Sequence, residues 1–358
     1  MKILQVTEAS SAGTLRIVEI LCGGMARRGH EVILAHGRRP ETPEVIGIDS
    51  PGTFQLEKLD WDRRTPLTQV RAFGQLRRLV RQVRPDVIHL HSAIAGLVGG
   101  MLDGRHPRVY TPHGWASTTT RDSRAGQALG LLADRFAIRR SDVVGVVSRS
   151  EAATARAMGA RRLGVVANGL PEFDNPPPTL SRPTSDPVVV SGGRLVAARR
   201  PLETAAILHQ LRDIAETSWI GDGHPRTVEK VRALGVEVTG WLAHDEAVGR
   251  MASADAYLHW SASDGQSVAV LEAMARGVVV IGSDIPPNRE LLDQSQLFTR
   301  EEDAARTLRR VLSSSELRAQ ITASQRKRGS THGADRMVQG WLDVYERTLT
   351  ARATARPS

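Results

Sequence analysis

The chain has 358 residues, of which 41% are hydrophobic and 24% are charged. This length exceeds what one hydrophobic core usually organises, so two domains are expected and extensive disorder is excluded. The net charge of +9 favours an anionic partner, whereas the aromatic content of 4% and the lack of zinc-ligand spacing argue against nucleic acid.

Cys22 is the single cysteine, so no internal disulfide can form, which fits a reducing compartment. The apolar run at residues 1–6 is too short for the core of a signal peptide. No run approaches the ~20 apolar residues that a membrane helix needs. We therefore expect a cytoplasmic protein.

Short β-rich runs alternate with helical patterns along the first half of the chain, which predicts parallel sheets built from βαβ units. A strand at residues 3–6 is followed by a small-residue loop at 10–13 and by a helix. The apolar residues of that helix recur at helical spacing: Leu15, Val18, Leu21 and Met25. Further strands are predicted at residues 32–35, 87–90, 108–111 and 143–147.

A dense group of prolines spans residues 170–187, which excludes a helix or an inner strand and predicts a semi-rigid linker over 171–187. The alternation then restarts, with strands predicted at 188–190, 219–220, 256–258 and 278–281 and a last helix over 334–349. The sequence thus indicates two Rossmann-like, doubly wound domains, over 1–170 and 188–333, that face a central cleft.

Two loops of the first domain follow strands and could bind a ligand. The loop Ser10-Ser11-Ala12-Gly13 precedes a helix, whose free N–H groups can bind an anion, although a tight turn explains it equally well. His113, in Thr111-Pro112-His113-Gly114, could donate a hydrogen bond or move a proton, although an isolated histidine is often structural.

The second domain begins with glycines at a strand end and arginines that are predicted to open a helix, in the segment 192–201. Arg194 and Arg199 suit a diphosphate, whose charge grows as its bond to the sugar breaks. Basic residues in the first turn of a helix oppose its dipole, which favours a functional role over a solvated helix start.

A second segment of this domain, 264–275, carries one carboxylate in a loop, Asp264, and one on the following helix, Glu272. Together they could hold two hydroxyl groups of one ligand. Two solvated acids would be the simpler explanation if this pair stood alone.

Several motifs together resemble the family-4 retaining glycosyltransferases of the GT-B fold. The segment 263–277 is similar to the E-x7-E motif of that family, and Gly193-Arg194-Leu195 with Arg199 is similar to its G-R-L-x-x-x-K motif. The remaining similar segments occur in the family's order: 29–32 (Gly-His-Glu-Val), 89–92 (His-Leu-His-Ser), 111–114, 147–148 and 168–169.

The resemblance implies a role for each matching residue. Glu272 would bind the ribose, and Arg194 and Arg199 the diphosphate. Asp264 and the residues after it would bind the donor sugar; these are Gly265, Gln266, Ser267 and Val268. His113 would reach the sugar or the reacting centre, and the loop at Gly13 would close on the phosphates.

The resemblance also implies that the sugar keeps its anomeric configuration, that no metal or other cofactor is needed, and that a helix over 334–350 returns to the N-terminal domain. Two residues depart from the family pattern, since Asp264 replaces a glutamate and Arg199 replaces a lysine. The motif at 111–114 is similar to that of polysaccharide and cell-envelope members, which favours a UDP-sugar of the hexosyl or N-acetylhexosaminyl type over GDP-mannose. The sequence leaves the acceptor open among a glycan, a lipid-linked molecule and a small molecule.

An arginine-rich amphipathic pattern around residues 71–84 could contact an anionic membrane at the inner face. Its apolar stripe (Phe73, Leu76, Val80 and Val83) could equally pack on a sheet. Two alternative functions use the same diphosphate site: a sugar-nucleotide epimerase and a non-catalytic nucleotide-sugar binder. A Rossmann oxidoreductase ranks last, because the G-x-G-x-x-G fingerprint is missing.

Overall fold

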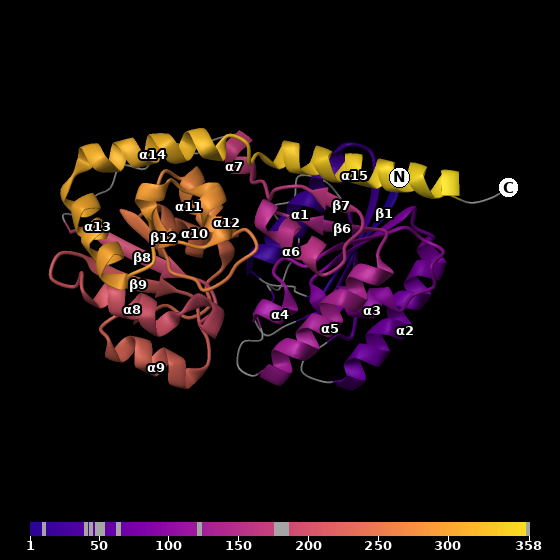
Figure 1. Ribbon diagram of the computed structural model, residues 1–358, viewed down its shortest axis with the longest axis horizontal. Helices are drawn as coiled ribbons and strands as arrows, with labels where there is room; N and C mark the ends of the chain where they lie inside the picture. The colour runs from indigo at the N-terminus through magenta and orange to yellow at the C-terminus, as the bar shows by residue number, and fades with distance from the viewer. Residues whose placement is uncertain are drawn as a thin grey trace. The chain divides into compact units, whose positions relative to one another are not determined.

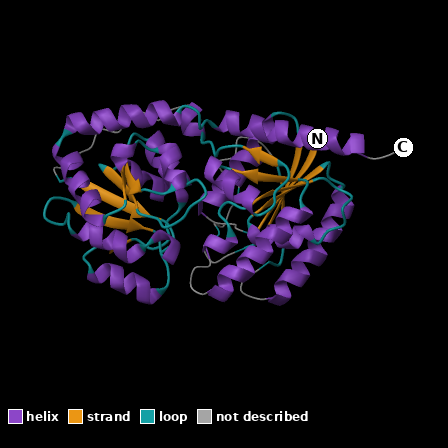
Figure 2. Cartoon of the chain, in the orientation of Figure 1, coloured by secondary structure: helices purple, strands orange, loops and turns teal. Residues whose placement is uncertain are grey.

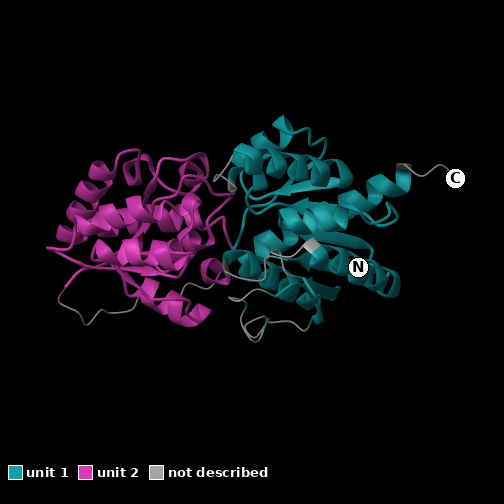
Figure 3. Cartoon of the chain, turned by 90° about the horizontal axis from the view of Figure 1, so that it is seen from below, with its two compact units in different colours: residues 1–169, 334–358 teal, residues 170–333 magenta. Residues whose placement is uncertain are grey.

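The computed structural model describes residues 1–8, 12–38, 42, 46, 54–61, 66–119, 124–174 and 186–355. The chain forms two compact units, one made of Met1–Gly169 with Ala334–Ser358 and the other of Leu170–Gly333 (Figure 3). Each unit has its own sheet with helices around it (Figure 2).

Unit 1 contains, within the described residues, a seven-stranded parallel sheet with the strand order β3-β2-β1-β4-β5-β6-β7. Its strands are β1 (Lys2–Thr7), β2 (Glu31–His36), β3 (Gln55–Lys58), β4 (Val87–His91), β5 (Arg108–Thr111), β6 (Val143–Val146) and β7 (Leu163–Val165). Its helices are α1 (Ala12–Arg27), α2 (Pro66–Val83), α3 (Ala93–Gly100), α4 (Ala116–Thr119), α5 (Arg124–Arg140), α6 (Arg149–Ala157) and α15 (Ala334–Ala355) (Figure 1).

Unit 2 contains, in the part of the chain that the structure describes, a six-stranded parallel sheet with the order β10-β9-β8-β11-β12-β13. Its strands are β8 (Val188–Gly192), β9 (Glu216–Ile220), β10 (Glu237–Val238), β11 (Ala256–His259), β12 (Val279–Ser283) and β13 (Leu297–Phe298). Its helices are α7 (Pro171–Asp174), α8 (Pro201–His209), α9 (Pro225–Ala233), α10 (His244–Ala252), α11 (Val268–Ala275), α12 (Pro286–Leu291), α13 (Glu301–Ser313) and α14 (Ser315–Gly329), with short 3₁₀ helices η1 (Ala197–Arg199) and η2 (Gln294–Gln296).

The predicted first helix is confirmed, because its apolar residues Leu15, Val18, Leu21 and Met25 are all buried in α1. The helix α15 packs against α1, so the last helix of the chain completes unit 1 as the fold class requires. Trp341 and Tyr345 of α15 are almost fully buried. The hydroxyl of Tyr345 lies 3.2 Å from the amide nitrogen of Gln5 on β1, which ties the two ends of the chain together.

The prediction of a helix-free linker from residue 171 was wrong at its start. Pro171–Asp174 form α7, a single helical turn that belongs to unit 2. Proline is tolerated in the first turn of a helix, where its missing N–H has no partner to lose. Residues 175–185 of the predicted linker lie outside the described residues.

Candidate functional site

The candidate site of unit 2 lies where the strand order of the sheet reverses. The strands β8 and β11 are neighbours in space although β9 and β10 separate them in the sequence. In open parallel sheets the carboxyl ends of such strands bind ligands. The chain leaves β8 at Gly192 and β11 at His259, so the predicted segments 192–201 and 264–275 follow these two neighbouring strand ends.

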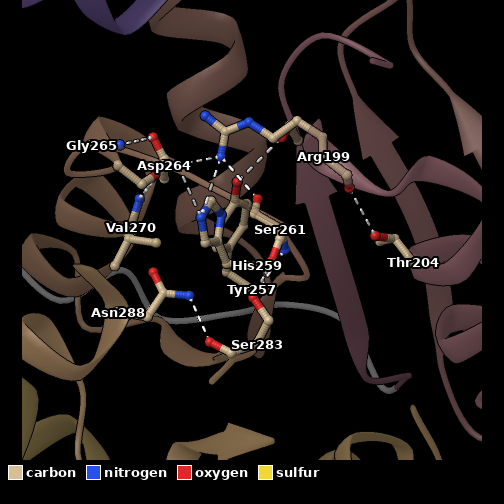
Figure 4. Close-up of polar contacts among 12 residues, drawn as sticks. Arg199, Thr204, Tyr257, His259, Ser261, Asp264, Gly265, Val270, Ser283 and Asn288 are labelled. Carbon is tan, nitrogen blue, oxygen red and sulfur yellow. Dashed lines mark hydrogen bonds and ion pairs between the residues drawn. The ribbon is translucent and has the colours of Figure 1, made fainter. Parts of the chain in front are cut away.

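Arg199 and Asp264 form an ion pair at this edge, with 2.7 Å between Nη1 and Oδ2 (Figure 4). The same Nη1 lies 3.2 Å from Nε2 of His259 and 3.3 Å from the hydroxyl of Ser261. The other carboxylate oxygen of Asp264 accepts a hydrogen bond of 2.9 Å from the N–H of Gly265. Three further polar groups, on His259, Ser261 and Gly265, therefore fix the positions of this guanidinium and this carboxylate.

The surroundings of Asp264 favour its ionised form, as its pKa shows. Burial by itself would raise the pKa of Asp264, but Arg199 and His259 together lower it well below the usual range of a carboxyl group. Burial lowers the pKa of His259, against the opposing effect of Asp264. At neutral pH the cluster therefore holds an ionised Asp264 beside a charged Arg199 and an uncharged His259.

Ser267 directly precedes α11, and Glu272 lies within this helix. Ser267 is the N-cap residue, and its hydroxyl accepts from the N–H of Val270 at 3.5 Å. Glu272 is buried, with 8% of its surface exposed, and its Oε1 lies 3.6 Å from Nε2 of His244. A carboxylate in this position can accept hydrogen bonds from two vicinal hydroxyls.

Arg194 and Gly193 occupy the segment directly after β8. Gly193 has a φ of 109°, which favours glycine, and its carbonyl accepts a hydrogen bond of 2.8 Å from the indole nitrogen of Trp219. The guanidinium of Arg194 lies over the ring of Trp241, 5.8 Å from its centroid. Arg194 thus has an aromatic contact that the Arg199–Asp264 pair does not share.

The expectation that the arginines open a helix was wrong. The helix α8 begins at Pro201, after both Arg194 and Arg199, and Arg199 ends the 3₁₀ helix η1. Arg200 is the N-cap residue of α8 with a φ of 45°. Proline at the first helical position fixes the start of α8, so the predicted conflict between the arginines and the helix dipole does not arise.

The remaining predicted residues of unit 2 surround the start of α11. Gly265 and Gln266 are buried, and the amide nitrogen of Gln266 lies 3.3 Å from Nε2 of His332. Val268 is the first residue of α11. The predicted residues 264–268 therefore form a continuous turn from the carboxyl end of β11 into the helix that carries Glu272.

In unit 1 the strand order reverses between β1 and β4. Glu8 directly follows β1 and is buried, with 2% of its surface exposed. Its Oε2 accepts a hydrogen bond of 3.3 Å from the hydroxyl of Ser92, which follows β4. Glu8 was not among the residues predicted from the sequence, although it follows a strand end, as the predicted segments do.

His113 follows β5, the strand beside β4, and has a φ of 50°. Its Nε2 lies 2.8 Å from Nδ1 of His91, and burial lowers the pKa of His113 to about 4. His113 is therefore neutral at pH 7, and it is not the general acid that a protonated imidazole would provide.

Glu151 fixes the loop of His113 through hydrogen bonds to the backbone, a role that the sequence did not indicate. Its Oε1 accepts from the N–H of Gly114 at 3.1 Å, and its Oε2 accepts from the N–H of Val147 at 3.0 Å. Gly114 has a φ of 104°, so two successive residues of this loop have left-handed backbone conformations. One buried carboxylate thus joins the loop after β5 to the turn after β6.

The helix α1 begins at Ala12, so Gly13 lies in its first turn and not in the predicted loop. Ser10 and Ser11 lie outside the described residues. Gly13 and His113 belong to unit 1, while the arginines and carboxylates of the prediction belong to unit 2.

Two Rossmann-like parallel sheets, each with charged or polar side chains after the strands where its order reverses, are the architecture of the GT-B fold. The sequence matches Glycosyltransferase Family 4 over residues 12–172 and Glycosyl transferases group 1 over residues 186–314. Because these ranges together span most of the chain, the protein belongs to the family-4 glycosyltransferases of the GT-B type.

Solved structures with the same fold include enzymes of sugar metabolism. Sucrose-phosphate synthase from Thermosynechococcus elongatus is 16% identical, with a TM-score of 0.82 over 98% of this chain and 100% of that chain. HepE from Anabaena, solved in complex with UDP and glucose, is 17% identical, with a TM-score of 0.79 over 97% of this chain and 99% of that chain. No curated protein sequence matches this chain.

Among the residues that the structure describes, no helix combines the length and apolar character needed to cross a membrane. The same residues include no group of three or more His, Cys, Asp or Glu side chains placed to hold a metal ion.

Proposed function

We propose that this glycosyltransferase moves a sugar from a nucleoside-diphosphate sugar, preferably a UDP-sugar, to an acceptor, with retention of the anomeric configuration. The observation that carries the proposal is the Arg199–Asp264 pair at the carboxyl ends of β8 and β11, 2.7 Å apart. It provides a cation for a diphosphate beside an anion for sugar hydroxyls. The choice of UDP is supported by HepE, which has been solved with UDP-glucose.

In this proposal Arg194 and Arg199 neutralise the diphosphate as it leaves, and Glu272 binds the ribose hydroxyls. Arg199 would act mainly on the transition state, because the negative charge of the diphosphate increases as the sugar bond breaks. The leaving phosphate would accept the proton of the acceptor hydroxyl. We expect the transferred sugar to be a hexose or an N-acetylhexosamine, and we expect turnover without an added divalent metal.

Glu272→Ala is expected to weaken UDP binding by about 10- to 100-fold, since a hydrogen bond to a charged group contributes about 1.5–3 kcal/mol. The measurement is the thermal shift of the wild-type protein and the variant with UDP, GDP, ADP and TDP. A bound nucleotide raises the unfolding temperature by an amount that grows with the logarithm of its concentration relative to its Kd. We expect UDP to give the largest shift, and Glu272→Ala to lose it.

The matched control is Glu229→Ala, which removes an exposed glutamate of α9 in the same unit. It should leave the shift unchanged. If none of the four nucleotides stabilises the wild-type protein, the proposed donor site is wrong. If a nucleotide-sugar is converted with no acceptor present, the protein is an epimerase and not a transferase.

We further propose that unit 1 contacts an anionic membrane through the outer surface of α2, α3 and α5. The helix α3 packs against both α2 and α5. Large apolar side chains are exposed along these three helices: Leu67 and Val70 on α2, Leu97 and Met101 at α3, and Leu129 and Leu132 on α5. The predicted stripe of α2 instead faces inward, with Leu76 and Val80 buried, so the exposed apolar residues are different ones.

The arginines of α2, at positions 71, 77, 78 and 81, are exposed, and so is Arg84 directly after the helix. Exposed apolar side chains beside arginines are typical of a surface that inserts shallowly between anionic headgroups. Such a contact supports a lipid-linked acceptor.

Replacing Arg77, Arg78 and Arg81 by glutamate is expected to reduce binding to phosphatidylglycerol vesicles on the order of 100-fold, since each basic residue near such a surface contributes ~1 kcal/mol. Cosedimentation at low salt measures this. The control reverses three exposed arginines of α13 in unit 2, Arg306, Arg309 and Arg310, which gives the same net charge. Equal loss in both variants, or no binding by the wild-type protein, would rule out this surface.

A further inference from the structure

A chain of buried polar side chains connects the last helix of the protein to His113. Gln5, His89, His91 and Tyr345 are all fully buried. The contacts run from Tyr345 to Gln5, from Gln5 to His91 and from His91 to His113. Because a neutral imidazole has one N–H donor and one acceptor nitrogen, each contact in this chain constrains the next.

The amide of Gln5 has one favourable orientation. Its nitrogen lies 3.2 Å from the hydroxyl of Tyr345 and 3.5 Å from the sulfur of Met25. A thioether sulfur accepts hydrogen bonds but cannot donate them, so the nitrogen and not the oxygen of the amide belongs on this side. The oxygen Oε1 of Gln5 therefore faces Nε2 of His91, at 2.7 Å.

The orientation of Gln5 determines where the ring hydrogen of His91 resides. An amide oxygen can only accept, so the hydrogen of His91 is on Nε2. Burial and the neighbouring His89 and His113 lower the pKa of His91 well below its usual value, so the ring is neutral and its Nδ1 is an acceptor. The 2.8 Å contact to His113 then requires that Nε2 of His113 donates.

The same reasoning extends to His89 on the other side of Tyr345. The hydroxyl of Tyr345 accepts from Gln5, so its own hydrogen is directed to Nδ1 of His89, 2.6 Å away. Nε2 of His89 then donates to the hydroxyl of Thr111, at 2.8 Å. No donor meets a donor in this arrangement, so the network determines one hydrogen position on each of the three rings.

The second ring nitrogen of His113, Nδ1, takes no part in this hydrogen-bond network. Among the described residues, Nδ1 of His113 makes no hydrogen bond, and the residue as a whole is half-buried. The left-handed backbone of His113 is unfavourable for a residue with a side chain and persists only where the surroundings hold it, here through Glu151 and the N–H of Gly114.

We propose that Tyr345, Gln5 and His91 are positioning residues that keep His113 in the tautomer with hydrogen on Nε2, so that its Nδ1 accepts a hydrogen bond from a sugar hydroxyl. This assignment of the ligand rests on the proposed function. His113 would thus select a hydroxyl, which can donate a hydrogen bond to Nδ1. It would reject a carbonyl or phosphate oxygen at the same point, because neither that oxygen nor Nδ1 carries a hydrogen to donate.

The tautomer can be read from the ¹⁵N chemical shifts of the histidine ring nitrogens in the full chain at pH 7. We expect His113 to show a protonated Nε2 and an unprotonated Nδ1. Tyr345→Phe removes the hydroxyl that orients Gln5, so the amide can turn over and His113 is expected to show a mixture of both tautomers. Gln5→Met, which removes the amide altogether, should have the same effect and serves if Tyr345→Phe does not fold.

The matched control is Tyr110→Phe, which removes the hydroxyl of another fully buried tyrosine of unit 1. Among the described residues that hydroxyl has no hydrogen-bond partner. It should leave the His113 signals unchanged. A protonated Nδ1 on wild-type His113, or unchanged signals in both Tyr345→Phe and Gln5→Met, would overturn the proposal.

The function of the tautomer is tested with UDP and UDP-glucose as probes. Tyr345→Phe is expected to weaken UDP-glucose binding about two- to tenfold, the contribution of one hydrogen bond, and to leave UDP binding unchanged. An equal loss for both probes, or no loss for either, would overturn the hydroxyl assignment. If neither probe binds the wild-type protein, the proposed function fails, while the ring signals still decide the tautomer.

Discussion

The double substitution Arg199→Lys with Asp264→Glu is expected to retain far more activity than either single substitution. The resemblance to the family indicates a lysine and a glutamate at these two positions, where this chain has arginine and aspartate. In the structure these two residues contact each other, with 2.7 Å between Nη1 of Arg199 and Oδ2 of Asp264. A longer cation here accompanies a shorter anion, so the exchange preserves the total reach of the pair.

Each single substitution should reduce kcat/KM about 10- to 100-fold, because it disrupts a partly buried hydrogen bond between charged groups, of about 1.5–3 kcal/mol. Arg199→Lys leaves the amine too far from Asp264, and Asp264→Glu crowds the guanidinium. The double variant should recover most of this loss, which appears as a coupling energy in a double-mutant cycle. The measurement is turnover of the nucleotide-sugar that stabilises the wild-type protein most.

The control cycle uses Arg309→Lys and Asp213→Glu, an exposed ion pair of the same unit with 2.6 Å between its atoms. The coupling energy that this control cycle gives for kcat/KM should be near zero, because exposed ion pairs have small interaction energies. If the double variant at Arg199 and Asp264 is no better than the worse single variant, the two departures are independent and the compensation is wrong.

Trp341→Ala is expected to lower the free energy of unfolding of unit 1 by about 3–5 kcal/mol, which is typical for removing a buried tryptophan. Trp341 is 2% exposed on α15 and lies against Gly145 on β6. A Cβ atom at Gly145 would overlap the indole ring, so the tryptophan fills the space that this glycine leaves open. Its ring centroid is also 4.6 Å from that of His89.

Urea unfolding followed by circular dichroism measures the effect, with the transitions of the two units fitted separately. Trp241→Ala is the control, since Trp241 is 43% exposed in unit 2 and its loss should cost less than about 1 kcal/mol. Trp341→Ala should leave the transition of unit 2 unchanged. A loss of less than 1 kcal/mol for unit 1, or a loss confined to unit 2, would contradict the packing described for α15.

The central strands could be predicted from the sequence, whereas the edge strands could not. The strands β1, β4, β8 and β12 are largely buried, and valine, isoleucine and leucine make up most of their residues. The strand β3, at the edge of its sheet, is largely exposed and polar and gives no such signal. Proline density does not reveal the helical turn at Pro171–Asp174, because proline is tolerated in the first turn of a helix.

The candidate site could be predicted as a set of segments but not as a set of contacts. The motifs identified Arg199 and Asp264 separately, and only the order of the strands brings them together. The partners of His113 are further apart still in the sequence, because Gln5 and Tyr345 lie at opposite ends of the chain. No local pattern can indicate a hydrogen bond that depends on how the whole unit folds.

Unit 1 is built from both ends of the chain, whereas unit 2 is one uninterrupted segment, Leu170–Gly333. During synthesis on the ribosome the segments of unit 2 are therefore all available before α15 has been made. Until α15 emerges, Gln5 and His89 lack the tyrosine that orders them, and the sheet of unit 1 lacks the tryptophan that covers Gly145. The buried histidines of unit 1 are therefore ordered only after α15 has been synthesised, later than every segment of unit 2.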